Sequence, residues 1–578
     1  MKLTLLTIAC FITALFFLAA RPGFSEKEKK QAVTRVKQFT IRCSPVLTDY
    51  ASTDSSHTIP LLSGWGSYKM QITAKNDSAV LYFEQGINLY YGFHIIEALA
   101  SFEKSAQLDS NFAMGYWGVA LALGPNINDF GYSASTAALT AMHKAKALAA
   151  HAAPFERALI EAMQVRYAAD SSLGREYLNQ LYANAMKNVY INFPDNADAG
   201  ALYADALMVQ HPWDLYSKQY LPRPWTPAIV HTLETVLAKH PGHPGAAHYY
   251  IHAVEASAHP EMALAVARKL VQQMPGVAHI VHMPSHIFIR SGYYKEGVMV
   301  NEKAVKSYYD YLMRYVDVAG NAPLYLIHAL HMQAACANMA GIYEASMNAS
   351  LDCRNSFDTS LQSTPDYLGT FIQYVYMTPV LTQIRFGKWT DILQLPPVSS
   401  GYVYANYLHH YARGMAWARK QDHSKAVAEL DSLQKLIKEP QLKAPAPSFA
   451  NPAIAGAVVA KKILEAVIAE EQHQLPQAIS LFKAAVSLED SMIYNEPKDW
   501  VHPTRQYLGN ALLKAAQYQQ AITVFREDLV VNPNNGWSLT GLSQAQAALG
   551  KKAEAVVTGN KARNAFAGSE IKIASSVF

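Results

Sequence analysis

The chain has 578 residues, of which 51% are hydrophobic and 16% are charged. This composition can bury a large core and excludes an intrinsically disordered chain. The formal net charge of +4 is small for this length. We therefore expect no nucleic acid or other polyanion among the partners of the protein.

Residues 1–25 have the pattern of a secretory signal peptide. One lysine precedes an almost unbroken apolar run from Leu3 to Ala20, and small residues follow near a cleavage site expected between Ala19 and Ser25. Since such a run also just reaches membrane-spanning length, an uncleaved anchor is the alternative. No later stretch is long and apolar enough to cross a membrane. We expect an exported, periplasmic protein, or one that its N-terminal segment anchors to the membrane.

A pattern with a period of about 34 residues recurs along the chain. It has a small residue in a first helix, alanine about twelve positions later, a bulky apolar residue four after that, and often a final proline. Copies are Gly86, Ala98 and Phe102; Gly414, Ala426 and Leu430; Ala466, Ala478 and Phe482; Gly509, Ala521, Phe525 and Pro533, followed by Ala555; and Ala263 with Pro275, then Gly297. This pattern predicts an all-α tetratricopeptide-repeat solenoid of antiparallel helix pairs.

The repeats and their interruptions predict the domain organisation. The expected segments are a signal peptide at 1–25, a leader at 26–77, N-terminal and central repeats with insertions at 78–310, further repeats at 311–442, a proline-rich connection at 443–453, C-terminal repeats at 454–567 and a tail at 568–578. The insertion Pro212–Thr226 contains three prolines and cannot be helical throughout. It either carries contacts to a partner or covers a helix edge with Trp213 and Trp225.

Several sequence words are more specific than the repeat pattern. They are YFEQGINLYYGFHIIEALASFEKSAQLD, YWGVALALGPNIND, HPGAAHYYIHAVEAS and HIVHMPSHIFIRSGYY. From about Ala79 to Ala565 the chain resembles a group of bacterial tetratricopeptide-repeat proteins of unassigned function. That resemblance implies the repeat architecture and no particular reaction. One departure is that His94 and Ile95 follow Phe93, where the group usually has asparagine and then histidine.

The stretch His240–Gly292 contains eight of the 21 histidines. On a helix with about 100° per residue, His248, His252 and Glu255 fall within roughly 60° of one another. A second such set is His279, His282 and His286. A return helix between the sets is expected to close at Pro275 and Gly276, and Pro284 is expected to bend the second histidine helix. The two His-x-x-x-His pairs are 34 residues apart, so they occupy equivalent positions in successive repeats.

First helices of such repeats line a concave groove and lie about 10 Å apart, so imidazoles from neighbouring helices can reach one ion. Histidine ligands without thiolate favour zinc, copper, iron or nickel. The alternative is that these histidines only pack within the core. The candidate metal ligands are His248, His252, Glu255, His279, His282, His286, His328 and His331.

No catalytic residue is assigned from the sequence, and enzymatic activity is left open. Tyr249 stands where a His-Glu-x-x-His metalloprotease has its base, and the chain has no glycine-rich phosphate loop or nucleophile elbow. Three hypotheses remain: a groove that binds a protein or peptide partner, a zinc, copper or iron metalloprotein, and a structural assembly module. Cys336 and Cys353 lie across an expected helix hairpin, where a disulfide is one option.

Overall fold

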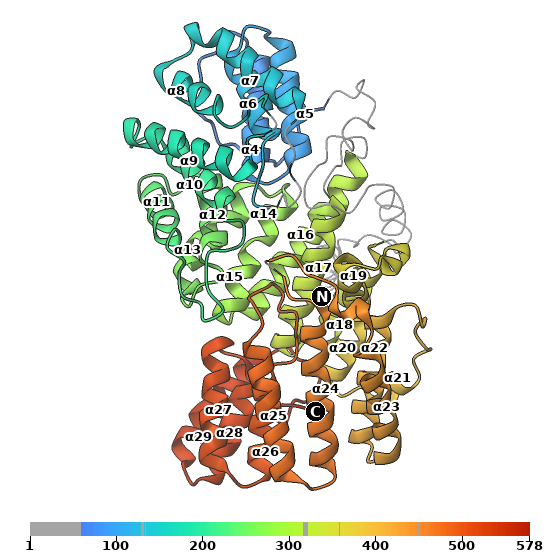
Figure 1. Ribbon diagram of the computed structural model, residues 1–578. Coiled ribbons are helices and arrows are strands. Elements are labelled where there is room, and N and C mark those ends of the chain that lie inside the picture. The colour runs from blue at the N-terminus through green and yellow to red at the C-terminus, as the bar shows by residue number, and fades with distance from the viewer. Residues whose placement is uncertain are drawn as a thin grey trace, which may run out of the picture.

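The computed structural model describes residues 59–578 apart from 129–131, 133–134, 171, 316–321, 358 and 449. The expected signal peptide, its cleavage site and most of the leader lie outside these residues and stay predictions. Within the described part of the chain, every regular element is a helix (Figure 1). None of these helices is long and apolar enough to cross a membrane. The fold is the all-α tetratricopeptide-repeat solenoid that the sequence predicts.

The first half of the solenoid contains the histidine-rich stretch. Helices α12 and α14 begin 34 positions apart, as the repeat requires. Pro284 interrupts the second histidine helix, so that α14 ends at His282 and α15 begins at the proline. The helices are α4 Asp77–Tyr91, α5 Ile95–Leu108, α6 Ala113–Ala122, α7 Thr136–Leu148, α8 Pro154–Met163, α9 Arg175–Asn192, α10 Ala197–Gln210, α11 Thr226–Lys239, α12 Pro244–Val254, α13 Leu264–Gln273, α14 Ala278–His282, α15 Pro284–Ser291 and α16 Tyr294–Arg314.

The second half continues with helix pairs of the same kind. Its helices are α17 Ala322–Ala340, α18 Tyr343–Asn355, α19 Tyr367–Tyr376, α20 Thr378–Arg385, α21 Trp389–Leu393, α22 Val403–Arg419, α23 His423–Leu436, α24 Ala453–Glu471, α25 Leu475–Asp490, α26 Thr504–Lys514, α27 Tyr518–Val531, α28 Gly536–Ala548 and α29 Lys552–Ala565. Short 3₁₀ turns lie at Ala149–His151, Pro260–Ala263, Thr359–Ser363 and Pro440–Lys443.

Packing inside the repeats follows the predicted alternation of small and bulky residues. A methyl group added at Gly509 would lie 2.4 Å from the ring of Phe525, and one at Gly541 would lie 2.2 Å from it. The phenyl ring therefore fills a space that two glycines of successive repeats leave open. The copy at Gly414 differs, because the atom facing it belongs to Leu464 of the next repeat rather than to Leu430. Leucine at this position reaches less far than phenylalanine, and the neighbouring helix fills the gap.

The C-terminal repeats fold back against the central ones. The Oη of Tyr294 in α16 donates to the backbone oxygen of Pro533 at 2.9 Å, and Nε1 of Trp537 donates to the backbone oxygen of Asn338 at 3.0 Å. In Figure 1, α27–α29 accordingly lie next to the central repeats around α15 and α16. This return brings the connection between α25 and α26 toward the histidine-rich helices.

The two cysteines of the expected hairpin do not form a disulfide. Cys336 and Cys353 are both buried free thiols. The Sγ of Cys336 faces Gly297, and the thiol of Cys353 donates to the backbone oxygen of Ile327 at 3.5 Å. The two side chains thus occupy separate helix interfaces, and the disulfide considered from the sequence spacing is wrong.

Candidate metal centre

The first histidine group lies on α12 and α14. The Nε2 atoms of His248 and His252 are 3.1 Å apart. The Nδ1–H of His248 donates to the backbone oxygen of Tyr91 at 2.6 Å, and the Nδ1–H of His252 donates to Glu255 Oε1 at 3.0 Å. His279 completes the group, with ligand atoms within 4.8 Å of one another. Because carbonyl and carboxylate oxygens only accept, both Nε2 atoms of the close pair present lone pairs when the rings are neutral.

The second group lies on α14, α15 and α17. The Nε2 atom of His286 is 2.9 Å from that of His282 and 3.3 Å from that of His328. Asn301 in α16 donates its amide N–H to the backbone oxygen of Gly297 at 2.8 Å, which leaves its Oδ1 to accept from His282 Nδ1 at 2.6 Å. The amide orientation therefore fixes the tautomer of His282 and leaves its Nε2 without a proton.

Two buried carboxylates lie beside the histidines. Glu255 at the end of α12 joins the two groups, because its Oε1 accepts from His252 and its Oε2 lies 2.6 Å from His286 Nδ1. Glu496, from the connection between α25 and α26, places its Oε2 2.8 Å from the same Nδ1. Ligands of one transition ion at right angles would be about 2.9 Å apart. The 2.6 Å contact is shorter than this and is an ion pair.

Aromatic rings enclose the first group. Phe93 stacks on His252 at 5.7 Å and on His279 at 5.8 Å between ring centroids. Tyr325 of α17 covers His279 at 4.4 Å. Trp213, from the insertion between α10 and α11, meets the ring of His252 edge-on at 5.2 Å. One role of the insertion is therefore to cover the histidines, the second of the two options that the sequence left open.

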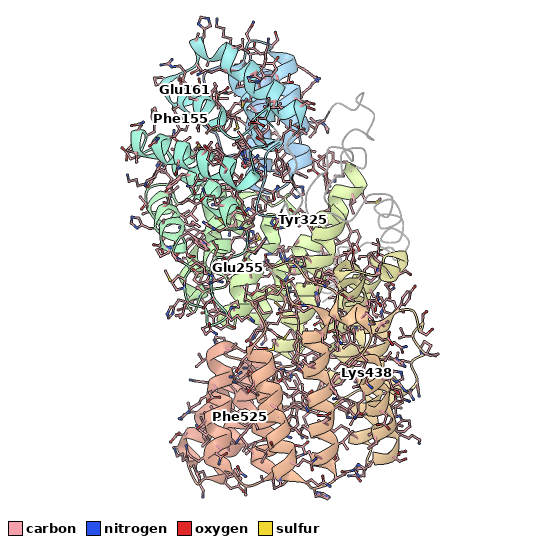
Figure 2. All side chains as sticks on the ribbon, viewed as in Figure 1. Phe155, Glu161, Glu255, Tyr325, Lys438 and Phe525 are labelled. Atoms are coloured by element: carbon pink, nitrogen blue, oxygen red, sulfur yellow. The ribbon has the colours of Figure 1, made fainter. Side chains whose placement is uncertain are left out.

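The centre is buried near the middle of the molecule, where Figure 2 labels Glu255 and Tyr325. The exposed fraction is 0% for His248 and 1% for His282, whereas His328 is partly exposed. We expected these side chains to line an open concave groove. Instead, the rings of Phe93, Trp213 and Tyr325 and the connection carrying Glu496 cover them. The partly exposed His328 marks the side from which solvent or an ion reaches the second group.

The electrostatic surroundings favour a cation at His286. Burial opposes its charged form, but Glu255 and Glu496 raise the pKa of His286 to about 10. Burial would raise the pKa of Glu255, yet His286 and His252 lower it to about 2. Burial, with a smaller effect of His286, lowers the pKa of His282 to about 3. The pKa values of His248, His279 and His328 lie well below the ordinary value. Burial is the largest cause, and the neighbouring imidazoles add to it.

The structure brings together seven of the eight candidate ligands. His331 joins neither group, and its ring instead packs near Tyr374 at 5.7 Å. The sequence prediction did not include three residues that complete the centre. They are Asn301 in α16, Glu496 between α25 and α26, and Phe93 between α4 and α5. An asparagine in the next helix and a glutamate in a long connection are weak sequence signals for a metal site. Neither has a fixed spacing from the histidines.

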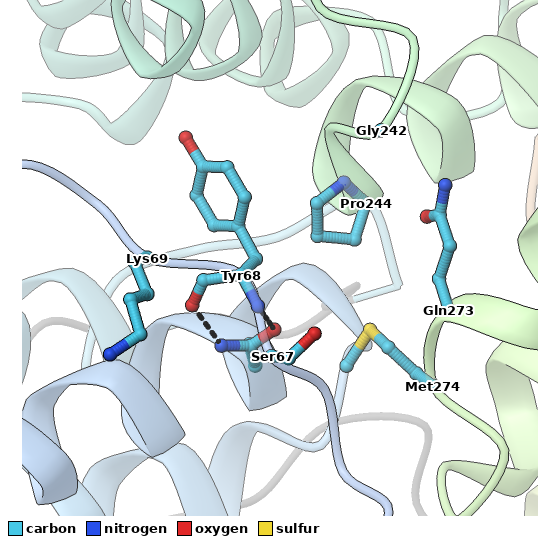
Figure 3. A pocket seen from close by; sticks show the side chains of 8 residues that line it. Ser67, Tyr68, Lys69, Gly242, Pro244, Gln273 and Met274 are labelled. Carbon is cyan, nitrogen blue, oxygen red and sulfur yellow. Dashed lines mark hydrogen bonds between the residues drawn. The ribbon is translucent and has the colours of Figure 1, made fainter.

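A separate cavity of about 300 Å³ lies between the segment before α4 and the start of α12 (Figure 3). Several of its polar groups are already paired. The Oη of Tyr68 donates to Asp198 Oδ2 at 2.8 Å, and the backbone oxygen of Tyr68 accepts from Asn88 at 2.8 Å. The lining residues are Ser67, Tyr68, Lys69, Asn88, Gly242, Pro244, Gln273 and Met274. Gln273 Oε1 has no hydrogen-bond partner, but among the described residues no group of metal-binding side chains lines this cavity, so the histidine centre is the stronger functional candidate.

Comparison with known proteins adds no assignment. No protein-family description and no curated protein matches the chain. The chain is similar to human IFIT1, seen as a dimer with m7Gppp-AAAA, at 13% identity over 94% of this chain and 96% of that one, with a TM-score of 0.28. The TPR domain of P58(IPK) gives 13% identity, coverages of 82% and 98% and a TM-score of 0.21. Yeast Tom70 is 10% identical over 84% of this chain and 92% of its own, with a TM-score of 0.27. At these TM-scores the similarities carry no argument about function.

Proposed function

We propose that the protein is a metalloprotein whose function depends on a first-row transition-metal ion bound by His282, His286 and His328. The observation that carries this proposal is the convergence of three Nε2 atoms, with 2.9 and 3.3 Å between neighbouring nitrogens. Two nitrogens bonded to one ion at 2.0–2.1 Å are about 2.9 Å apart at a right angle and about 3.3 Å apart at the tetrahedral angle. Both separations therefore fit one shared ion.

A shared proton explains the arrangement less well. An N–H···N hydrogen bond has a similar length, so one proton satisfies one pair of nitrogens. The third nitrogen then keeps an unshared lone pair that faces the other two. An ion satisfies all three nitrogens at once. The two carboxylates behind His286 also offset the positive charge of an ion in this interior.

The donor set defines the class of ion and its chemistry. Three imidazoles without thiolate suit zinc, copper or iron, and three protein ligands leave a coordination position open for water or a substrate. Asn301 holds the ring of His282 in the tautomer that exposes Nε2. Partly exposed His328 gives this position its contact with solvent.

Metal content tests the proposal. The full chain without an affinity tag is purified, and bound metals are measured by elemental mass spectrometry and by titration of the metal-free protein with Zn²⁺, Cu²⁺ or Fe²⁺. We expect stoichiometric binding, and His328→Gln should remove the equivalent held by these three histidines. His331→Gln, on the same helix but outside both groups, is the matched control and should keep the ion. Failure of the folded wild-type protein to bind any of these ions would refute the proposal and leave the histidines a packing role.

We also propose that the chain is exported to the periplasm, since Leu3–Ala20 has the apolar length of a signal peptide. N-terminal sequencing of the protein recovered from its native membrane and soluble fractions tests this, because a cleaved start between Ala19 and Ser25 would separate export from anchoring. Binding of a protein or peptide partner remains a prediction from the repeat architecture. The covered histidines do not provide its surface.

A further inference from the structure

We infer that a second transition-metal ion binds between His248, His252 and His279, so that the protein carries a centre of two ions linked through Glu255. This inference rests on the proposed function in that the first ion occupies the neighbouring group. Its own support comes from a different set of side chains on α12 and α14. The two sets share no histidine.

The close pair of the first group is arranged to receive an ion. His248 and His252 each use Nδ1–H to donate to an oxygen, and their Nε2 lone pairs face each other at 3.1 Å. This separation corresponds to an angle of about 98° at an ion with bonds of 2.0–2.1 Å. Without an ion or an added proton, the two lone pairs repel each other in a site that water does not reach.

His279 supplies the independent observation. Its side chain is 4% exposed, and neither ring nitrogen has a hydrogen-bond partner. Leaving a buried polar group unsatisfied costs about 1–3 kcal/mol, so such a ring calls for a ligand. A ligand nitrogen of His279 lies within 4.8 Å of those of the close pair. The ring is therefore close enough to join an ion held by that pair with at most a small inward shift.

Glu255 couples the two ions. One of its oxygens faces His252 in the first group, and the other faces His286 in the second. Its negative charge lies between the sites and reduces the repulsion between two cations. Each ring that it orients becomes a better ligand. The remaining repulsion should make the second ion bind more weakly than the first, so binding should occur in two phases.

The inference is tested by the stoichiometry of the full chain. Metal-free protein is titrated with Co²⁺ and with Zn²⁺, and bound equivalents are counted by native mass spectrometry. The wild-type protein should bind two equivalents. His279→Phe keeps an aromatic ring between Phe93 and Tyr325 and should bind one. His328→Gln should also bind one, by loss of the other site, and the control His331→Gln should bind two.

The outcomes separate this inference from the proposed function. One equivalent in the wild type, lost in His328→Gln and retained in His279→Phe, overturns the second site alone. One equivalent lost in both variants means a single shared ion and also overturns it. One equivalent lost only in His279→Phe refutes the proposed site and retains this one, whereas no binding refutes both. If circular dichroism shows that His279→Phe is unfolded, His252→Gln takes its place in the same comparison.

Discussion

Replacing Glu255 with glutamine tests the connection between the two histidine groups. In the wild-type protein, Glu255 Oε1 accepts from His252 Nδ1–H at 3.0 Å, and Glu255 Oε2 lies 2.6 Å from His286 Nδ1 in an ion pair. Glutamine has nearly the same size, but it offers one acceptor and one donor. One of the two rings then faces an N–H group and must move its proton to Nε2. That ring can no longer bind an ion through Nε2.

The expected loss follows from the role of such hydrogen bonds. Removing an orienting partner of a ligand histidine typically lowers metal affinity 10–100-fold, which corresponds to about 1.4–2.7 kcal/mol. Because Glu255 contacts one histidine of each group, Glu255→Gln should weaken both binding phases. Glu496→Gln provides the matched comparison, since Glu496 contacts His286 of the second group. It should weaken the phase assigned to that group and leave the other unchanged.

The assay is competition for Zn²⁺ or Co²⁺ between each variant and a chromophoric chelator of known affinity. Circular dichroism and the midpoint of thermal unfolding of the metal-free proteins verify that the fold is retained. Unchanged affinities in folded Glu255→Gln would refute the reasoning that this carboxylate sets the tautomers. Equal losses in the Glu255 and Glu496 variants, confined to a single phase, would refute the link between the groups.

Three further predictions concern the solenoid. Gly541→Ala should lower the free energy of unfolding, measured by chemical denaturation, by about 1–3 kcal/mol, because the new methyl group would lie 2.2 Å from the buried ring of Phe525. Gly242→Ala is the control and should change this free energy little, because a methyl group there would have no atom within 4 Å. Burial raises the pKa of Asp205 to about 6 from 3.8. Between about pH 4 and 6 the folded state keeps a proton that the unfolded state releases, so stability falls as the pH rises through this range. Asp205→Asn should remove up to about 3 kcal/mol of this pH dependence, as unfolding free energies measured at both pH values can show. Cys336 and Cys353 should react with iodoacetamide only after unfolding, with or without reductant, as peptide mass spectrometry can show.

The fold could be predicted because its determinants are local and repeated. Glycine and phenylalanine at set positions, as at Gly86 and Phe102, specify how two adjacent helices approach, and the same pair recurs along the chain. The break at Pro284 also follows from the missing N–H of one residue. The return of the C-terminal repeats could not be predicted in this way. Small rotations between successive repeats accumulate over the whole solenoid, and no local pattern sets their sum.

The same distinction explains the candidate centre. Helical spacing placed His248 and His252 on one face, and the 34-residue period placed the second pair beside them. His331 joins neither group, because three positions along α17 rotate a side chain by about 60° from His328, enough to direct it toward Tyr374. Glu496 comes from more than 200 positions away, so only the folded chain shows its contact with His286.

Burial makes the histidine centre more informative than an open groove would have been. Exposed imidazoles in a groove would be hydrated, and their clustering alone would say little about an ion. In the interior, each unpaired ring nitrogen and each carboxylate has a free-energy cost that folding must offset. Here His279 has no partner, the Nε2 lone pairs of His248 and His252 face each other, and Glu255 and Glu496 converge on His286 Nδ1. Positive ions between these side chains would remove all three costs together, which packing alone does not.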